Sequence, residues 1–146
     1  MSHTNLLYHL IFATKNRAPI IHTEWESSLH VYLGGIIKGQ NGVPIEINGI
    51  EDHVHALVRL SPTKALAEFL REFKSDSTGF VRREFEKRFS WQRRYGAFTV
   101  SESNVETVRA YIRNQKNHHM TMGFDEEYRK ILLLNSVEFE EKYLWN

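Results

Sequence analysis

The sequence predicts an α+β fold of the ferredoxin-like βαββαβ type, with an antiparallel sheet, helices on one face and further helices at the C-terminal end. The first supporting observation is the order of apolar patterns along the chain: strand, helix, strand, strand, helix, strand, helix. The second is the length of 146 residues, which suits one domain with its own core. The third is the lack of cysteine, which excludes a disulfide scaffold, a cysteine-based zinc site and a thiol nucleophile.

The first strand and the first helix are predicted by a change in apolar period. Residues 5–14 are rich in apolar side chains without a helical repeat, which favours a buried strand. This stretch lacks the basic segment and the cleavage site of a signal peptide. Residues 23–40 place apolar side chains at helical spacing, and Thr23 and Glu26 have the spacing of a capping box.

Two alternating segments follow and predict a β-hairpin. Residues 43–50 and 53–60 alternate between apolar and polar side chains. The turn is expected near residues 51–52, and an Asn-Gly pair at 48–49 is a competing turn signal.

The second half of the chain predicts a long helix, a short strand and two more helices. A Ser-Pro pair at 61–62 favours a helix start, and one apolar stripe runs through residues 63–88, with a looser middle at the SDSTG stretch. Residues 95–100 predict a short strand. A helix over 103–119 begins with a Ser-x-x-Glu capping box, and a short helix at 125–134 precedes the tail.

Charge is distributed unevenly, although the net charge is only +1. Residues 51–100 carry a net +3 and residues 101–146 a net −2. Within residues 71–94, eight bases stand against four acids, which indicates either a solvated helix face or a phosphate-binding surface.

No segment approaches the roughly 18 apolar residues of a membrane span, and the cytoplasm is the expected location.

His53 and His55 form a candidate metal site. Side chains two residues apart in a strand leave the same face, so both imidazoles are close enough to share a divalent cation. Imidazole is a common ligand of transition metals. The alternative is a pair of histidines on a half-exposed strand that bind nothing.

Tyr111 and Gln115 are four residues apart and share one face of the helix predicted at 103–119. His118 extends this polar face, which lies beside the apolar stripe of the same helix. Tyr111 is therefore expected at the rim of the core, next to the sheet. From the helix alone, an ordinary rim tyrosine with its hydroxyl in water is the favoured interpretation.

Several segments together carry a resemblance to a known family. They are YHLIFATKNR in the first strand, GIEDHVHALV around the histidine pair, FSWQRRYGAFTVSES before the helix and VRAYIRNQKNHH within it. In this order, the chain resembles the HUH-type single-tyrosine transposases of small insertion sequences. It is most similar to the subgroup associated with repetitive extragenic palindromes, whose ending the KYLW tail also resembles.

The resemblance implies a single transposase domain over residues 1–146 and a role for each motif residue. Tyr111 matches the nucleophile of the family. His53 and His55 match the pair that binds Mg²⁺ or Mn²⁺, and Gln115 matches the third ligand. The sequence departs from the family pattern at none of these positions, which implies an intact enzyme.

The implied reaction is metal-dependent cleavage and rejoining of single-stranded, hairpin-containing DNA through a covalent 5′-phosphotyrosine. The metal would bind the phosphate and align it for attack. A phenolate with a pKa of about 10 leaves more readily than an alkoxide, so the ester can be resealed. The family includes homodimers that complete the site between subunits as well as monomers.

The basic stretch is expected to hold the backbone of the DNA hairpin. The candidate residues are Lys74, Arg82, Arg83, Lys87, Arg88, Arg93 and Arg94. Lys74 also matches a DNA-contacting lysine of the family. Trp91 and Tyr95 are candidates to stack on an unpaired base, whereas Phe98 is expected in the core.

Two other functions are compatible with the sequence. A domesticated module would hold structured nucleic acid with the same fold and catalyse nothing. A metal-dependent phosphodiesterase would use the histidine pair with water as the nucleophile, and its turnover would survive the loss of Tyr111.

Overall fold

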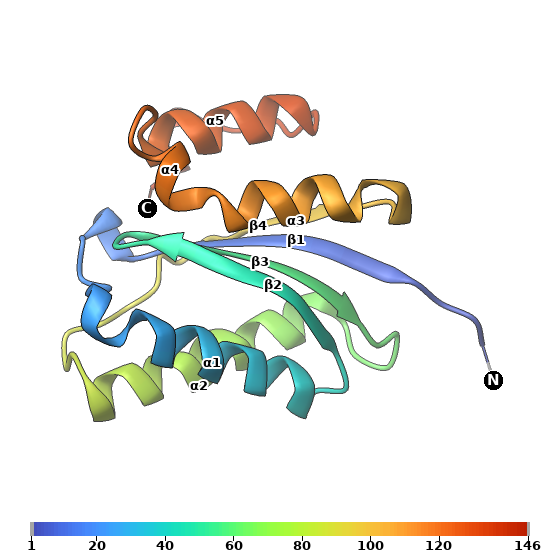
Figure 1. Ribbon diagram of the computed structural model, residues 1–146, viewed down its shortest axis with the longest axis horizontal. Coiled ribbons are helices and arrows are strands. Elements are labelled where there is room, and N and C mark those ends of the chain that lie inside the picture. Colours follow the sequence, from blue (N-terminus) through green and yellow to red (C-terminus); the bar gives the residue numbers. More distant parts are fainter. Residues whose placement is uncertain (1, 146) are drawn as a thin grey trace.

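The computed structural model describes residues 2–145 and consists of a sheet with helices on both faces (Figure 1). The strands are β1 (Leu6–Ala13), β2 (Val43–Ile50), β3 (His53–Leu60) and β4 (Gly96–Thr99). They form one antiparallel sheet in the order β2-β3-β1-β4. This arrangement confirms the predicted ferredoxin-like α+β fold.

The helices form a layer on each side of the sheet (Figure 1). The first layer contains α1 (Thr23–Gly39) and α2 (Leu66–Glu84), as predicted. The second layer contains α3 (Val105–Arg113), α4 (Gln115–His118) and α5 (Phe124–Leu134). Short 3-10 turns lie at Lys15–Arg17, Glu102–Asn104 and Glu141–Tyr143. Within residues 2–145, no helix is long and apolar enough to cross a membrane.

The β2–β3 hairpin sets the position of the histidine pair. It turns at residues 51–52, and the competing Asn-Gly pair stays inside β2. Gly49 is needed there because a Cβ atom would overlap the carbonyl oxygen of His53 and lie 2.9 Å from the Cα of Val54. Val54 packs in the core formed with α1 and α2. Since side chains alternate along a strand, His53 and His55 face the second helical layer.

Helix α1 begins at residue 23 as predicted but without the expected capping box, and α2 begins three residues later than predicted. The N-cap residue of α1 is His22, so Thr23 is already helical and does not act as the cap of a capping box. Helix α2 begins at Leu66, because residues 62–64 form a turn in which the Ser61 hydroxyl bonds to Thr63. The SDSTG stretch does not loosen α2, which is continuous through it.

The helix predicted over 103–119 is interrupted. Its expected capping box lies in and just after a 3-10 turn, and the chain leaves helical geometry at Asn114. The side-chain amide of Asn48 donates to the carbonyl oxygens of Ile112 and Arg113, at 3.1 Å each. This satisfies carbonyl groups that the end of α3 leaves free, and a new helix starts at the next residue.

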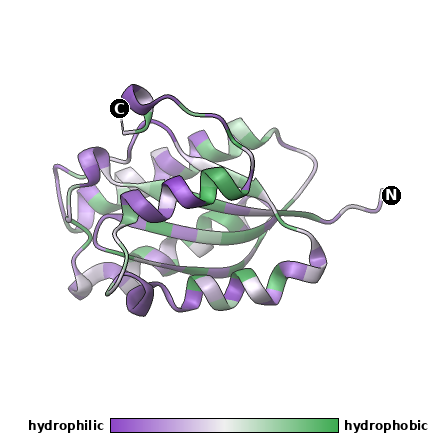
Figure 2. Cartoon of the chain, turned by 90° about the horizontal axis from the view of Figure 1, so that it is seen from above, coloured by the Kyte–Doolittle hydropathy of each residue, from purple (hydrophilic) through white to green (hydrophobic). Residues whose placement is uncertain are grey.

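The core has two parts, one on each face of the sheet. The larger part lies under α1 and α2, and Figure 2 shows hydrophobic stretches along the central strands. Its fully buried large side chains include Leu10, Phe12, Leu29, Leu33, Ile37, Leu70, Phe73 and Phe89. The smaller part lies under the second layer and contains Ile11, Ala13, Phe98, Phe124, Leu132 and Leu144. Phe98 is thus a core residue, as expected.

Trp91 is also a core residue, which corrects its interpretation as a side chain that stacks on DNA. Its side chain is 5% exposed and contacts the rings of Phe12 and Phe89. Its indole N–H donates to the Ser77 hydroxyl at 2.9 Å. Trp91 is buried because a β-bridge between Thr14 and Trp91 holds this part of the basic segment against the end of β1.

Replacement of Ser77 by Ala is expected to lower the free energy of unfolding by about 1–3 kcal/mol. The Ser77 hydroxyl donates to the carbonyl of Phe73 and accepts the indole N–H of Trp91, which would be left buried without a partner. Urea unfolding followed by tryptophan fluorescence measures the change. The exposed Ser75→Ala variant on the same helix is the control, and equal stability of the two variants would contradict the prediction.

Candidate active site

The predicted site residues meet between the sheet and its second helical layer. His53 and His55 come from β3, Tyr111 from α3 and Gln115 from α4. Both histidines and Gln115 are fully buried. The Nε2 atom of His53 lies 3.0 Å from Oε1 of Gln115, and the ring centroid of Tyr111 lies 5.8 Å from that of His55. These side chains are therefore brought together within one chain.

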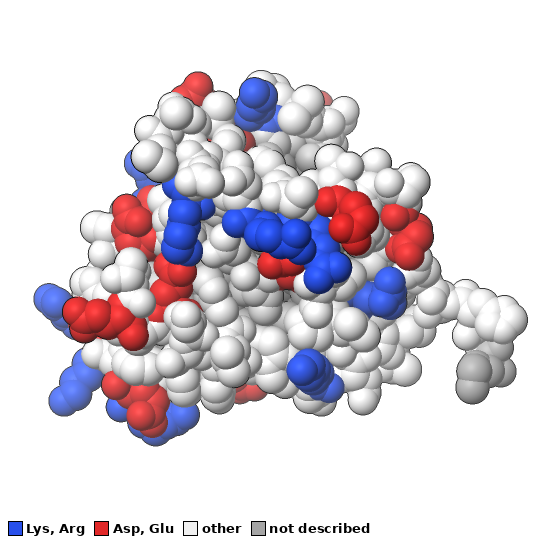
Figure 3. Space-filling view, viewed as in Figure 1, with Lys and Arg blue, Asp and Glu red and all other residues white. Residues whose placement is uncertain are grey.

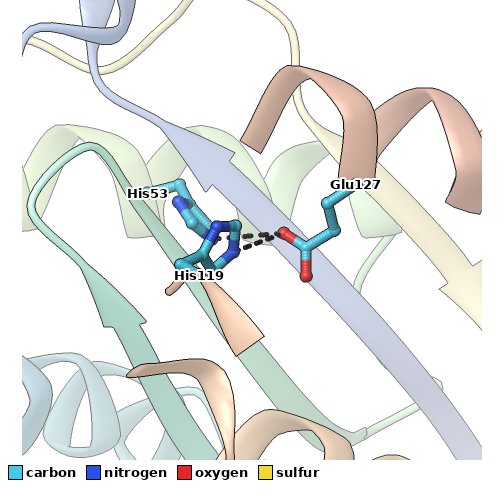
Figure 4. Close-up of side chains that lie close together, drawn as sticks. All are labelled: His53, His119 and Glu127. Atoms are coloured by element: carbon cyan, nitrogen blue, oxygen red, sulfur yellow. Dashed lines mark hydrogen bonds and ion pairs between the residues drawn. The ribbon is translucent and has the colours of Figure 1, made fainter. Parts of the chain in front are cut away.

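Glu127 of α5 lies at the centre of this group, and the sequence reasoning missed it. Its Oε1 atom is 3.3 Å from Nε2 of His55 and 3.4 Å from Nε2 of His53. The same oxygen is 3.0 Å from Nε2 of His119. Figure 4 shows the His53 and His119 rings directed at the Glu127 carboxylate. A single oxygen atom thus faces three imidazoles.

The second carboxylate oxygen of Glu127 faces the candidate nucleophile. Its Oε2 atom accepts a hydrogen bond from the Tyr111 hydroxyl. It also accepts one from Nε2 of Gln115, at 2.9 Å. Glu127 therefore connects the tyrosine to the histidines.

Glu127 is hard to recognise because it sits in an acidic segment, DEEYRK. Its neighbour Glu126 is exposed, whereas Glu127 is 1% exposed. A usable signal is the helical spacing: Glu127 is three residues after Phe124 and four before Ile131, so it shares their apolar face. A lone carboxylate on an apolar face indicates a buried partner.

The other ring nitrogen of each strand histidine is also engaged. Nδ1 of His53 lies 2.8 Å from Oδ1 of Asp52. Nδ1 of His55 lies 2.8 Å from Nε2 of His9, whose ring stacks on it. Partners of this kind fix the orientation of metal-binding histidines. They leave both Nε2 atoms directed into the site.

Burial and neighbouring charges give the histidines different pKa values. Burial lowers the pKa of His55 to about 4 and that of His9 to about 3. For His53, burial acts in the same direction, but Asp52 and Glu127 outweigh it and raise the pKa.

The pKa of Tyr111 is raised, whereas the pKa of Glu127 is lowered. Burial, and then the contact with Glu127, raises the pKa of Tyr111 above its usual value. Burial alone would raise the pKa of Glu127, but hydrogen bonds from His119 and the strand histidines hold it well below its usual range. The site therefore contains a carboxylate next to a neutral tyrosine.

The donor set fits a divalent metal ion. His53, His119 and Glu127 each offer a ligand atom, and these atoms lie within 4.8 Å of one another. Oε1 of Gln115 is 3.0 Å from Nε2 of both His53 and His119. Imidazole is a common ligand of divalent transition metals, and amide and carboxylate oxygens suit Mg²⁺ and Mn²⁺.

Two of the predicted DNA-binding bases support a loop. The Lys74 ammonium donates to the backbone carbonyls of Gln92 and Arg93, and burial lowers its pKa. Nε of Arg82 donates to the carbonyl of Phe89 at 2.7 Å. Both side chains thereby position the segment that follows α2.

The remaining bases of the stretch are exposed. They are Arg83, Lys87, Arg88, Arg93 and Arg94. The Arg93–Arg94 segment lies near the site, because the backbone N–H of Gln92 bonds to the carbonyl of Ala13, the residue opposite His53. Arg94 also donates to the carbonyl of Tyr143 in the tail, at 2.8 Å.

A second group of bases borders the site and was not predicted. Arg109 and Arg113 bind Oε1 of Glu46 at 3.0 and 3.1 Å. Lys116 binds Oε1 of Glu26 at 2.6 Å. Figure 3 shows basic and acidic side chains next to one another on this face. These positive charges are therefore locally neutralised.

Known proteins that are similar to this chain are described as transposases. The family described as "Transposase IS200 like" matches residues 2–115. The transposase for insertion sequence element IS200 of Salmonella typhimurium is 26% identical over 124 residues, which cover 79% of this chain and 81% of that protein. The ISDra2 transposase TnpA of Deinococcus radiodurans is 32% identical over 121 residues, which cover 75% of this chain and 84% of that protein.

Two solved structures share the fold. A putative transposase from Deinococcus radiodurans has a TM-score of 0.65 at 26% identity and covers 78% of this chain and 93% of its own. A REP-associated tyrosine transposase bound to a REP hairpin has a TM-score of 0.62 at 15% identity and covers 82% of this chain and 74% of its own. The second likeness concerns the fold alone.

Proposed function

This chain belongs to the family of IS200-like transposases, enzymes that cleave and join DNA, and from that premise we propose that Tyr111 is its nucleophile. The observation that carries the proposal is the position of Tyr111, whose ring lies 5.8 Å from that of His55 in the same chain. In this proposal, Tyr111 and the histidine pair of the same chain form the site.

The proposed reaction is a transesterification at a phosphodiester of single-stranded DNA. The phenolic oxygen of Tyr111 forms a bond to phosphorus, and the bond from phosphorus to the 3′ oxygen breaks. The products are a 5′-phosphotyrosine and a free 3′-hydroxyl. Attack by a 3′-hydroxyl on the phosphotyrosine reverses the step and joins strands, so no nucleotide cofactor is required.

We assign Mg²⁺ or Mn²⁺ to His53, His55 and Gln115. When bound, the ion supplies Lewis-acid stabilisation of the phosphate oxygens. The chain's own contribution is orientation: Asp52 and His9 hold the two imidazoles so that their Nε2 atoms face the site. Burial of these side chains excludes water that would otherwise compete for the ligand atoms.

The proposed partner is single-stranded or hairpin DNA. The exposed bases Arg83, Lys87, Arg88, Arg93 and Arg94 supply positive charge beyond the neutralised group around Glu46. Tyr95 is 37% exposed and offers a ring face for stacking. Lys74 and Arg82 would act indirectly, through the loop that they hold.

A covalent product tests the proposal directly. The protein is incubated with a labelled single-stranded hairpin substrate and Mg²⁺ or Mn²⁺, and the products are separated under denaturing conditions. A labelled species that migrates with the protein is expected. Binding without any such species across a range of hairpins would favour a nucleic-acid-binding module without catalysis.

Hairpin binding is expected to weaken with salt, because each neutralised phosphate releases counterions. In the double variant Lys87→Gln/Arg88→Gln, the slope of log K against log salt should fall by up to about 2. Fluorescence anisotropy across a salt series measures it. Lys38→Gln/Lys130→Gln, which removes two exposed charges from α1 and α5, is the control. A slope that is unchanged in the first variant would count against this surface.

A further inference from the structure

The site contains two side chains that lie beyond the part of the chain matched by the family. The match ends at residue 115, whereas His119 follows α4 and Glu127 belongs to α5. Glu127 is 1% exposed, and the side chain of His119 is 4% exposed. A carboxylate buried to this extent needs cationic or hydrogen-bonding partners. The C-terminal segment therefore contributes a charged group to the interior of the site.

The distances around Glu127 fit a shared metal ion. Its Oε1 atom lies 3.3 Å from Nε2 of His55, 3.4 Å from Nε2 of His53 and 3.0 Å from Nε2 of His119. Ligand atoms bonded to one cation at about 2.1 Å are separated from their neighbours by about 3.0 Å in octahedral and about 3.4 Å in tetrahedral geometry. The separations found here span this range.

The hydrogen-bonding pattern is also compatible with a bound cation. Asp52 accepts a hydrogen bond from Nδ1 of His53, so the neutral form of this imidazole presents a lone pair at Nε2. That lone pair faces the oxygens of Gln115 and Glu127, which are acceptors as well. Electron-pair donors that face one another at this distance repel unless a positive charge lies between them, and either a proton on Nε2 or a bound cation supplies it.

We propose that Glu127 is a ligand of the metal centre and binds the ion through Oε1 while Oε2 keeps Tyr111 beside it. This inference rests on the proposed function for the role of His53, His55 and Gln115 as the other ligands. The side chain of His119, which lies C-terminal to α4, faces the same Glu127 oxygen through Nε2 and joins those of His53, His55 and Gln115 at the site.

A carboxylate ligand changes the chemistry of the centre. Imidazoles and an amide are neutral, so Glu127 brings the negative charge that hard cations such as Mg²⁺ and Mn²⁺ favour. With Glu127 as a ligand, the centre would present less positive charge to the phosphate. The same carboxylate would contact both Tyr111 and the ion, and it would therefore fix their relative position before DNA binds.

Binding of Mn²⁺ alone, measured by isothermal titration calorimetry, tests the ligand role without reference to activity. Glu127→Gln keeps the size of the side chain and removes its charge, and we expect it to lower the affinity roughly tenfold or more. Glu126→Gln makes the same change at an exposed position of the same helix and should bind as wild type. His53→Ala should also lose affinity. Circular dichroism shows whether each variant is folded.

The outcomes separate this inference from the proposed function. Wild-type affinity in Glu127→Gln together with loss of affinity in His53→Ala would overturn the role of Glu127 and leave the metal centre intact. Wild-type affinity in both variants would overturn the metal centre itself.

A measurement on the unmodified protein covers the case in which Glu127→Gln does not fold. Glutamate labelled with ¹³C at the side-chain carboxyl should give a strong ¹³C coupling to bound Mn²⁺ in electron–nuclear double resonance. Bound Mn²⁺ without that coupling would overturn the proposal.

Discussion

Replacement of Tyr111 by Phe should abolish the covalent protein–DNA species, with a loss of at least about three orders of magnitude in its rate of formation. Phenylalanine keeps the ring that packs beside His55 and removes only the oxygen that would bond to phosphorus. Hairpin binding should persist, because the exposed bases are unchanged. Denaturing electrophoresis of reactions with labelled DNA measures the adduct, and fluorescence anisotropy measures binding.

The control for this variant is Tyr32→Phe. Tyr32 stacks on Phe80 in the first helical layer, on the opposite side of the sheet from Tyr111. It should form as much adduct as wild type. Adduct formation by Tyr111→Phe at the wild-type level would contradict the assignment of the nucleophile. Cleavage that continues without an adduct would instead favour a phosphodiesterase that uses water.

Replacement of His53 by Ala should separate binding from cleavage. His53 is fully buried, and its Nε2 atom faces both Gln115 and Glu127, so its removal takes a ligand from the centre of the proposed metal site. Cleavage should fall by about a hundredfold or more. Hairpin affinity, measured without metal, should stay within about twofold of wild type, since the exposed bases carry it.

The matched variant is His3→Ala, which removes an exposed imidazole that precedes β1. It should cleave as wild type. Because His53 is buried, circular dichroism and thermal unfolding must show that His53→Ala is folded before its activity is compared. A folded His53→Ala protein that cleaves at the wild-type rate would remove His53 from the mechanism.

The parts of the fold that the sequence predicts well are those with a clean apolar period. Strands β2 and β3 have the bounds that were predicted, because the alternation of their side chains ends where the hairpin turns. Helix starts were predicted less well. The Ser-Pro pair at 61–62 lies in a turn and does not start the helix. The turn is stabilised by a hydrogen bond between the Ser61 and Thr63 hydroxyls. At Asn114 the interruption depends on Asn48, which lies 66 positions earlier in the sequence.

The candidate site shows the same limit. The spacing of His53 and His55 on one strand placed both imidazoles on one face, and the structure brings Tyr111 and Gln115 to them. Glu127 was missed because its contacts with the histidines, Gln115 and Tyr111 join segments that are separate in the sequence. Its position on an apolar helix face can be read from the sequence. Trp91 was misread for the opposite reason: its neighbours in sequence are arginines, whereas its neighbours in space are Phe12 and Phe89.

The close approach at Gly49 couples two positions that differ entirely in chemistry. A side chain at position 49 would collide with the backbone of His53, so it would displace an imidazole that it never touches in the native protein. Substitutions along this hairpin are therefore limited by backbone packing as well as by chemistry. Gly49 has no side chain that could contact a substrate, yet a larger residue there would disturb the backbone of His53.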